Sequence, residues 1–281
     1  MMAFPSPRLT VISRFLISLL LVSLCLMLPG QAGATELNPE ISITAEQLQA
    51  GDALANKAFA ATEAGDFATA EQYWTQLIND FPQNPAVWSN RGNARVSQNN
   101  LDGAIADFNQ AIKLAPDQAD PYLNRGTALE AKGDFTAAIA DYNQVLSIDP
   151  KDAFAFNNRG NAEGGLGDWQ TALADFQQAT AIAPDFAFAQ ANTALALYEL
   201  GETQKAIATM RKLVRKYPMF ADMRAALTAV LWTEGQQGEA ESNWVATVGV
   251  DGRYQNLTWV KEIRRWPPSM ITALDQFLSL N

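Results

Sequence analysis

The chain has 281 residues, of which 48% are hydrophobic and 18% charged, and this composition is typical of a folded protein rather than a disordered tail. It has no histidine and one cysteine, Cys25, which excludes a Cys/His zinc site, a histidine-based catalytic triad and a two-cysteine redox motif. The net charge of −10 argues against a nucleic-acid partner, because binding to phosphates requires an excess of Lys and Arg.

The N-terminal stretch, residues 1–34, has the pattern of a secretory signal peptide. Two arginines precede a 14-residue apolar run, residues 15–28, which Pro29-Gly30 ends. The small residues 32–34 then match a signal-peptidase site, so we expect cleavage after Ala34. The alternative is an uncleaved membrane anchor, but this run is shorter than the roughly 20 residues that span a bilayer. We therefore expect an exported chain without stable membrane insertion after cleavage.

Charge is unevenly distributed along the rest of the chain. Residues 35–199 contain 8 basic and 22 acidic residues, whereas residues 200–281 contain 10 basic and 8 acidic residues. An acidic surface attracts oppositely charged partners, so we expect a partner with a basic segment. Residues 35–50 are expected to form an N-terminal linker.

From residue 51 the sequence repeats every 34 residues. Evenly spaced prolines mark each period: Pro82, Pro116, Pro150, Pro184 and Pro218. A large residue lies eight positions before each proline, an alanine twelve before, and a glycine or asparagine seventeen before. Five units follow from this register, and a degenerate sixth has Gly252 where proline is expected: 51–84, 85–118, 119–152, 153–186, 187–220 and 221–254.

The pattern resembles the tetratricopeptide repeat (TPR), a 34-residue helix-turn-helix unit. Each unit has two apolar segments at helical spacing, and one such pair cannot bury its apolar face alone. The resemblance implies an all-α fold in which five to six pairs stack into a right-handed superhelix. The first helix of each pair would line a concave groove, and a helical segment, 255–281, would cap the last repeat.

Arginine and aspartate recur together in the middle repeats. The arginines of three Asn-Arg-Gly motifs each have an aspartate sixteen residues later, giving the pairs Arg91 with Asp107, Arg125 with Asp141, and Arg159 with Asp175. Where the arginine is absent, as at Thr193, the aspartate is absent too, as at Thr209. This joint occurrence favours structural ion pairs between helices, with ligand binding as the alternative.

An asparagine recurs on the first helix of five repeats, at Asn56, Asn90, Asn124, Asn158 and Asn192. A side-chain amide donates and accepts hydrogen bonds as a peptide bond does, so a column of asparagines can hold an extended backbone. The column resembles the asparagine ladder of O-linked N-acetylglucosamine transferases, which implies a peptide-binding groove. The alternative is that these side chains bond neighbouring helices.

Further along the chain the predicted groove positions become aromatic, at Phe154, Phe188, Tyr198 and Trp232. Aromatic residues often dominate binding hot spots, so we expect them to contact the peptide. Gly164-Gly165 interrupts the same face and would leave room for an incoming side chain, or would simply loosen the end of the helix.

The C-terminal ending, Trp259-Val-Lys-Glu-Ile-Arg-Arg-Trp-Pro-Pro, precedes a predicted amphipathic helix from about Ser269 to Leu280. Together with the signal peptide, this ending resembles TPR proteins of cyanobacteria and of the thylakoid lumen. The resemblance implies a periplasmic or lumenal protein that acts in the assembly of photosystems and other photosynthetic membrane complexes.

The sequence therefore predicts a non-enzymatic scaffold that binds a protein or peptide segment, with no catalytic residue, cofactor or metal ligand assigned. The alternative is an acidic protein that binds or delivers Mn²⁺ or Ca²⁺ through turn carboxylates such as Asp149, Asp152 and Asp185. Aspartate is also a common turn residue, which favours a solvated role for these side chains.

Overall fold

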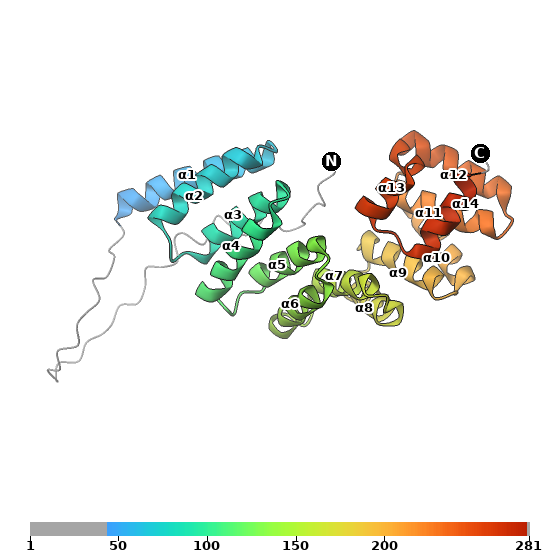
Figure 1. Cartoon of the computed structure of the whole chain (residues 1–281), viewed down its shortest axis with the longest axis horizontal. Helices are drawn as coiled ribbons and strands as arrows, with labels where there is room; N and C mark the ends of the chain where they lie inside the picture. The colour runs from blue at the N-terminus through green and yellow to red at the C-terminus, as the bar shows by residue number, and fades with distance from the viewer. Residues whose placement is uncertain (1–43, 280–281) are drawn as a thin grey trace. The chain divides into compact units, whose positions relative to one another are not determined.

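The computed structural model describes residues 44–279, so the predicted signal peptide and most of the linker lie outside the described residues. Every regular element in residues 44–279 is a helix (Figure 1), which confirms the predicted all-α class. The first helices of the six repeats are α1 (Ala45–Glu63), α3 (Pro85–Ser97), α5 (Ala119–Lys132), α7 (Ala153–Gly165), α9 (Ala187–Glu199) and α11 (Ala221–Thr233). The second helices are α2 (Phe67–Asp80), α4 (Leu101–Leu114), α6 (Phe135–Ile148), α8 (Trp169–Ile182), α10 (Thr203–Lys216) and α12 (Gln237–Val250).

A left-handed residue joins the two helices of each repeat. It lies seventeen positions before the repeat's proline, or before Gly252 in the sixth repeat, and its φ is positive in every repeat: Gly65 (74°), Asn99 (60°), Gly133 (84°), Gly167 (87°), Gly201 (78°) and Gly235 (71°). Glycine adopts this conformation without steric cost, and asparagine tolerates it better than most residues. In repeats 1 to 4 the next residue caps the second helix, as when Asp66 accepts the backbone N–H of Thr69 at 3.1 Å. The sequence signal for the turn thus has a direct conformational cause.

Glycines on the first helices allow the two helices of a repeat to approach closely. A Cβ atom on Gly92 would lie 2.6 Å from the ring of Phe108, and one on Gly160 would lie 2.7 Å from the ring of Phe176. Both phenylalanines are buried and lie eight residues before the repeat's proline. The 34-residue period therefore reflects a packing contact between the two helices of a repeat. In this contact a large side chain on the second helix fills the space beside a glycine on the first.

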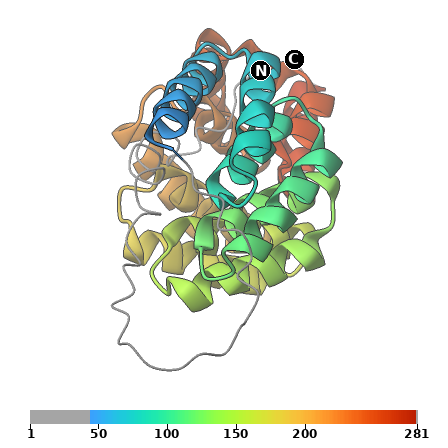
Figure 2. The ribbon, with the colours of Figure 1, turned by 90° about the vertical axis from the view of Figure 1, so that its left-hand side faces the viewer.

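The described residues divide into two compact units, one that ends at Ala128 and one that begins at Leu129. In the first unit α1 and α2 lie side by side (Figure 2) and α3 packs against α2 and α4. Trp74, Leu77 and Phe108 are among its buried side chains. In the second unit α6 to α12 pack in chain order, and a large apolar core runs from Ala172 to Phe277.

The C-terminal segment folds back onto the second unit. It consists of η1 (Gly252–Gln255), α13 (Leu257–Trp259), a π-helical turn η2 (Val260–Arg264) and α14 (Pro268–Leu278). Helix α14 packs against α11 and α9, two first helices (Figure 1), so it covers part of the first-helix face of this unit. The ring of Phe277 meets those of Trp232 and Trp244 edge-on, with centroids 5.2 and 5.1 Å away.

Candidate functional site

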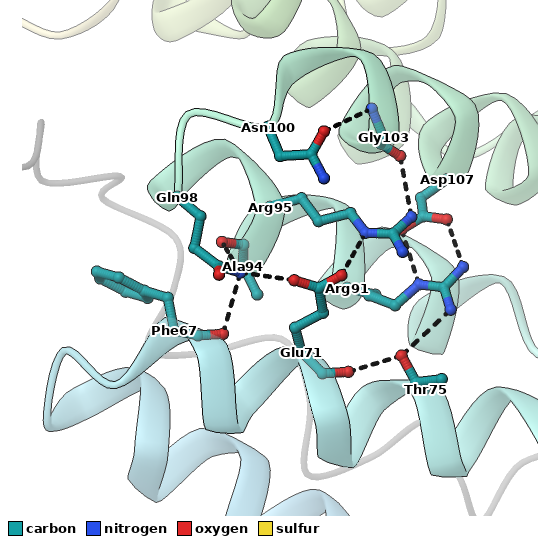
Figure 3. Close-up of polar contacts among 10 residues, drawn as sticks. All are labelled: Phe67, Glu71, Thr75, Arg91, Ala94, Arg95, Gln98, Asn100, Gly103 and Asp107. Carbon is teal, nitrogen blue, oxygen red and sulfur yellow. Dashed lines mark hydrogen bonds and ion pairs between the residues drawn. The ribbon is translucent and has the colours of Figure 1, made fainter.

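The Arg–Asp position of the second repeat is a network between helices α2, α3 and α4 (Figure 3). Arg91 donates to both oxygens of Asp107, through Nε at 2.9 Å and Nη2 at 2.7 Å, and its Nη1 reaches the hydroxyl of Thr75 at 3.3 Å. Arg95 bridges Glu71 at 2.8 Å and Asp107 at 2.9 Å. The buried Asp107 carboxylate is thus held by two guanidinium groups, a strong charge-assisted arrangement.

The fourth repeat has the same arrangement in the second unit. Arg159 donates to Asp175 through Nε and Nη2, both at 2.7 Å, and its Nη1 reaches Asn143 at 2.6 Å. The hydrogen bonds to Asp175 raise the pKa of Arg159 above its ordinary value, so the guanidinium stays ionised. In the first unit Arg125 donates to Asn109 at 2.5 Å. Its predicted partner Asp141 belongs to the other unit, so that pairing stays a prediction.

Each of these arginines also stacks on an aromatic ring one turn earlier. The guanidinium carbons of Arg91, Arg125 and Arg159 lie 5.0, 5.7 and 5.4 Å from the ring centroids of Trp88, Tyr122 and Phe156. A guanidinium that is stacked and hydrogen-bonded to neighbouring helices has little capacity left for a ligand. This geometry favours a structural role for the arginines.

The predicted asparagine column differs between the two units. Asn90 and Asn124 are half-buried on α3 and α5, and neither side chain hydrogen-bonds to another described residue. Asn56, on α1, is exposed. These three amides of the first unit are therefore available to a ligand.

In the second unit the asparagines bond one another. Asn192 Nδ2 donates to Asn157 and to Asn161, both at 3.0 Å, and Asn157 Nδ2 donates to Asn158 at 3.2 Å. The alternative interpretation, in which asparagines link neighbouring helices, thus describes Asn192, which joins α9 to α7.

The four predicted groove aromatics have different surroundings. Phe154 packs against Phe186 with ring centroids 4.8 Å apart, while Trp232 contacts Phe277 of the C-terminal segment. Tyr198 is half-buried against the large core of the second unit. Phe188 is 44% exposed, and its ring lies edge-on to Phe220. Among these four, Phe188 offers the largest free surface.

The paired glycines of α7 accommodate aromatic rings of the chain itself. A Cβ on Gly164 would lie 2.7 Å from Trp169, and one on Gly165 would lie 2.6 Å from Phe135. Both glycines are within helix α7. The space that we considered for an incoming side chain is thus filled by the adjacent second helices, which the spacing of the motif did not reveal.

One titrating group that the sequence did not single out is Glu130, near the end of α5. Burial raises the pKa of its carboxyl to about 7, and the hydrogen bond from Tyr142 OH, at 3.0 Å, opposes this shift. Arg265, in a left-handed conformation with φ of 54°, donates to the carbonyl oxygens of Glu130 and Ala131 at 3.2 and 3.3 Å. The C-terminal segment therefore contacts the end of α5 through main-chain acceptors.

The turn carboxylates make local contacts. Asp152 accepts the backbone N–H groups of Phe154 and Ala155 at 2.9 and 3.0 Å and so caps α7. Asp185 pairs with Lys216 at 2.6 Å, and this hydrogen bond lowers the pKa of the aspartate. Residues 44–279 contain no group of three His, Cys, Asp or Glu side chains placed to hold a metal ion. None of the helices in this range is long and apolar enough to cross a bilayer.

Family models match most of the repeat region. One described as "TPR repeat" matches residues 92–133, and three described as "Tetratricopeptide repeat" match residues 52–84, 119–152 and 157–219. The chain is a tetratricopeptide repeat protein. The TPR matches thus include the repeats that contain the Arg–Asp pairs and the asparagine column.

Two curated relatives are similar to parts of this TPR protein. Tetratricopeptide repeat protein 36 of Bos taurus is 33% identical over 86 residues, which are 31% of this chain and 46% of that protein. Hsp70-Hsp90 organizing protein 2 of Arabidopsis thaliana is 39% identical over 61 residues, 22% of this chain and 11% of that protein. The chain thus spans less than half the length of these relatives.

Solved structures share the fold over longer stretches. A tetratricopeptide repeat protein from Parabacteroides merdae matches 83% of this chain and 93% of its own, with a TM-score of 0.63 and 18% identity. The APC/C component Cut9-Hcn1 matches 72% of this chain and 40% of its own, with a TM-score of 0.64 and 18% identity. YrrB, described as a TPR protein with an unusual peptide-binding site, matches 64% and 92%, with a TM-score of 0.51 and 18% identity. At these identities the likeness shows the fold.

Proposed function

We propose that this chain is a non-enzymatic scaffold that binds an extended protein or peptide segment on its first helices. The observation that carries the proposal is the pair of half-buried amides of Asn90 and Asn124, which make no hydrogen bond to other described residues. They occupy the same position of two successive repeats. Each amide can donate to one peptide carbonyl and accept from one peptide N–H, so the two hold a backbone without reading its sequence.

Asn56 extends this set by one repeat, so the first unit contributes Asn56, Asn90 and Asn124. These amides are accessible to solvent, so a ligand would replace their water partners without first breaking a hydrogen bond inside the described part of the protein. In the second unit an extended segment would contact Asn158 and the exposed face of Phe188. Asn192 would have to exchange its bonds to Asn157 and Asn161.

Charge supports a basic partner. Residues 35–199 hold 22 acidic against 8 basic residues, and a field of this sign speeds the association of a positively charged segment at low salt. The relatives support only the broader class, a protein or peptide partner, since one is named for organizing Hsp70 and Hsp90 and the structural neighbour YrrB is described as having a peptide-binding site.

The test is affinity capture from the native organism with the mature chain, followed by titration of the captured protein. We expect the N90A/N124A variant to bind at least tenfold more weakly, which is about 1.4 kcal/mol, with an unchanged helical circular dichroism signal. N79A is the matched control, because Asn79 is an exposed asparagine on the second helix α2. If N90A/N124A binds like the wild type, the groove hypothesis fails and the partner docks elsewhere.

The setting of this scaffold is a further part of the proposal. The signal-like leader and the Trp-rich ending support an exported protein of the periplasm or thylakoid lumen that acts in the assembly or maintenance of photosynthetic membrane complexes. N-terminal sequencing of native protein tests the export step. A start near Thr35 supports it, and an intact Met1 in a membrane fraction contradicts it.

A further inference from the structure

In the fourth repeat, the arginine side chain fills the space between two consecutive second helices. There the guanidinium of Arg159, from α7, reaches Asn143 on α6 and Asp175 on α8. The three residues form a closed polar bridge. In the next repeat the equivalent positions hold Gln177, Thr193 and Thr209. The long side chain and its carboxylate partner are both replaced by short hydroxyl residues.

An open cleft lies at this position. Its volume is about 630 Å³, and it is lined by residues of α8, α9 and α10 and of the turn before α10: Gln170, Leu173, Gln177, Thr193, Leu197, Leu200, Glu202, Lys205 and Thr209. We call it the outer cleft; it lies among α8, α9 and α10, and no asparagine of the column lines it. The whole cleft belongs to the second unit.

The outer cleft combines an apolar part with neutral polar groups. Leu173, Leu197 and Leu200 supply the apolar part. Leu197 is the counterpart of Glu163 in the fourth repeat. This second position is therefore charged in the fourth repeat and neutral in the fifth. The rim charges compensate each other, since Lys205 and Glu202 form an ion pair at 3.0 Å. A charged ligand group would therefore lose water without meeting a free opposite charge.

The polar groups of the cleft are suited to an amide. Thr193 and Thr209 donate their hydroxyl hydrogens to the carbonyl oxygens of Ala189 and Lys205, at 2.8 and 2.9 Å, so their oxygen lone pairs can accept from a ligand. Gln177 offers a donor and an acceptor at the position where Asn143 accepts from Arg159. A ligand N–H group can thus meet hydroxyl acceptors, and a ligand carbonyl can meet the Gln177 amide.

We propose that the outer cleft is a second binding site, which takes an uncharged peptide segment of a partner protein. The segment places an amide group where the arginine guanidinium lies in the fourth repeat, and an aliphatic side chain against the three leucines. This site is independent of the asparagine groove, since the two sets share no residue.

The chain itself provides the substitution that tests the proposal. The T193R/T209D variant restores the Arg–Asp pair of the fourth repeat, with Gln177 in place of Asn143, and should close the cleft while the fold is kept. The probe is N-acetyl-glutaminyl-leucinamide, titrated into the full chain and followed by NMR of the Thr and Leu methyl groups. We expect saturable shifts at Thr193, Thr209 and Leu197 in the wild type, and at least a tenfold loss of affinity in the variant.

A milder pair of variants keeps the test decisive if T193R/T209D does not fold. Q177A removes an amide from the cleft, and Q178A, at an exposed neighbouring position outside it, is the matched control. We expect Q177A to weaken probe binding several-fold and Q178A to leave it unchanged. The proposal is overturned if the probe causes no saturable shift at the cleft, or if Q177A and Q178A bind it equally well. N90A/N124A should leave this binding unchanged, so failure here is distinct from failure of the groove.

Discussion

Asp222 anchors the C-terminal segment, and its removal should release that segment. One oxygen of this buried carboxylate, Oδ1, accepts from Tyr254 OH at 2.7 Å, from Arg264 Nε at 2.8 Å and from Trp266 Nε1 at 3.0 Å. Burial, and then the negative charge of Asp222, raise the pKa of Tyr254, so its hydroxyl stays a donor. All three donors lie in residues 252–266, the stretch that leads into α14, and α14 itself packs against α11.

D222A should lower the free energy of unfolding, because it leaves three buried or largely buried donors without their acceptor. Two neutral donors lose their acceptor, and the largely buried Arg264 guanidinium loses its counter-charge. Breaking a buried ion pair by removing one partner costs about 3–5 kcal/mol. D222N keeps a side-chain oxygen for some of the donors but no charge, so we expect about 1–3 kcal/mol. Urea unfolding followed by hydrogen exchange measures both values and locates the change.

The pattern of hydrogen exchange decides the interpretation. D222A should lower protection in α13, η2 and α14, and on the α11 surface that they cover, while α6 to α8 keep theirs. Two results refute this reasoning. One is an unchanged unfolding midpoint for D222A, and the other is an equal loss of protection throughout the second unit, which would mean that Asp222 supports the whole core rather than this segment.

Three further predictions concern charged groups. R159L should destabilise the second unit by about 1–3 kcal/mol, because buried Asp175 loses its partner, and R159L/D175N should recover much of that loss in thermal melts. Burial raises the pKa of Glu130 from 4.5 to about 7, so its contribution to stability is full below pH 4.5 and is lost as the pH rises through 7. E130Q should remove this part of the pH dependence in urea unfolding between pH 5 and 8. Titration calorimetry with Mn²⁺ and Ca²⁺ should give no saturable heat, because Asp152 and Asp185 already serve as a helix cap and a lysine partner.

The repeat register could be predicted because each marked position has one local cause. The glycine or asparagine at the turn is required by a positive φ, as at Gly65 and Asn99. The small residue on the first helix is required by the aromatic ring facing it, as with Gly92 and Phe108. Such causes recur once in every repeat, so five copies reinforce one another. The all-α class and the order of the helix pairs follow from this register.

The arrangement of the C-terminal segment could not be predicted in the same way. Its helix was expected from about Ser269, close to the observed start at Pro268, because its amphipathic pattern is local. Its packing on α9 and α11 depends on single long-range contacts, such as that of Trp266 with Asp222 across 44 positions. No repeating sequence position predicts such contacts. The surroundings of Gly164 and Gly165 were missed for another reason, since the rings of Trp169 and Phe135 that lie against them begin the second helices α8 and α6, and the sequence interpretation did not pair these rings with glycines.

The two units therefore expose different sides of the same repeat to a partner. In the first unit the asparagines of the first helices are free, and the Arg91–Asp107 bridge fills the space between the second helices. In the second unit α14 already lies on the first helices α9 and α11, while the loss of the arginine at Thr193 opens the space between α8 and α10. An extended ligand that continued past Phe188 along the first helices α9 and α11 would have to displace α14 and expose Phe277, which is 1% exposed. Displacement would also expose Met270 and Leu274 of the same helix, and each such side chain costs about 1.5–3 kcal/mol, so the total exceeds the gain from a few peptide hydrogen bonds. Binding to the proposed asparagine groove in the first unit requires no such displacement, and binding to the proposed outer cleft would also leave α14 in place, because no residue of α14 lines that cleft.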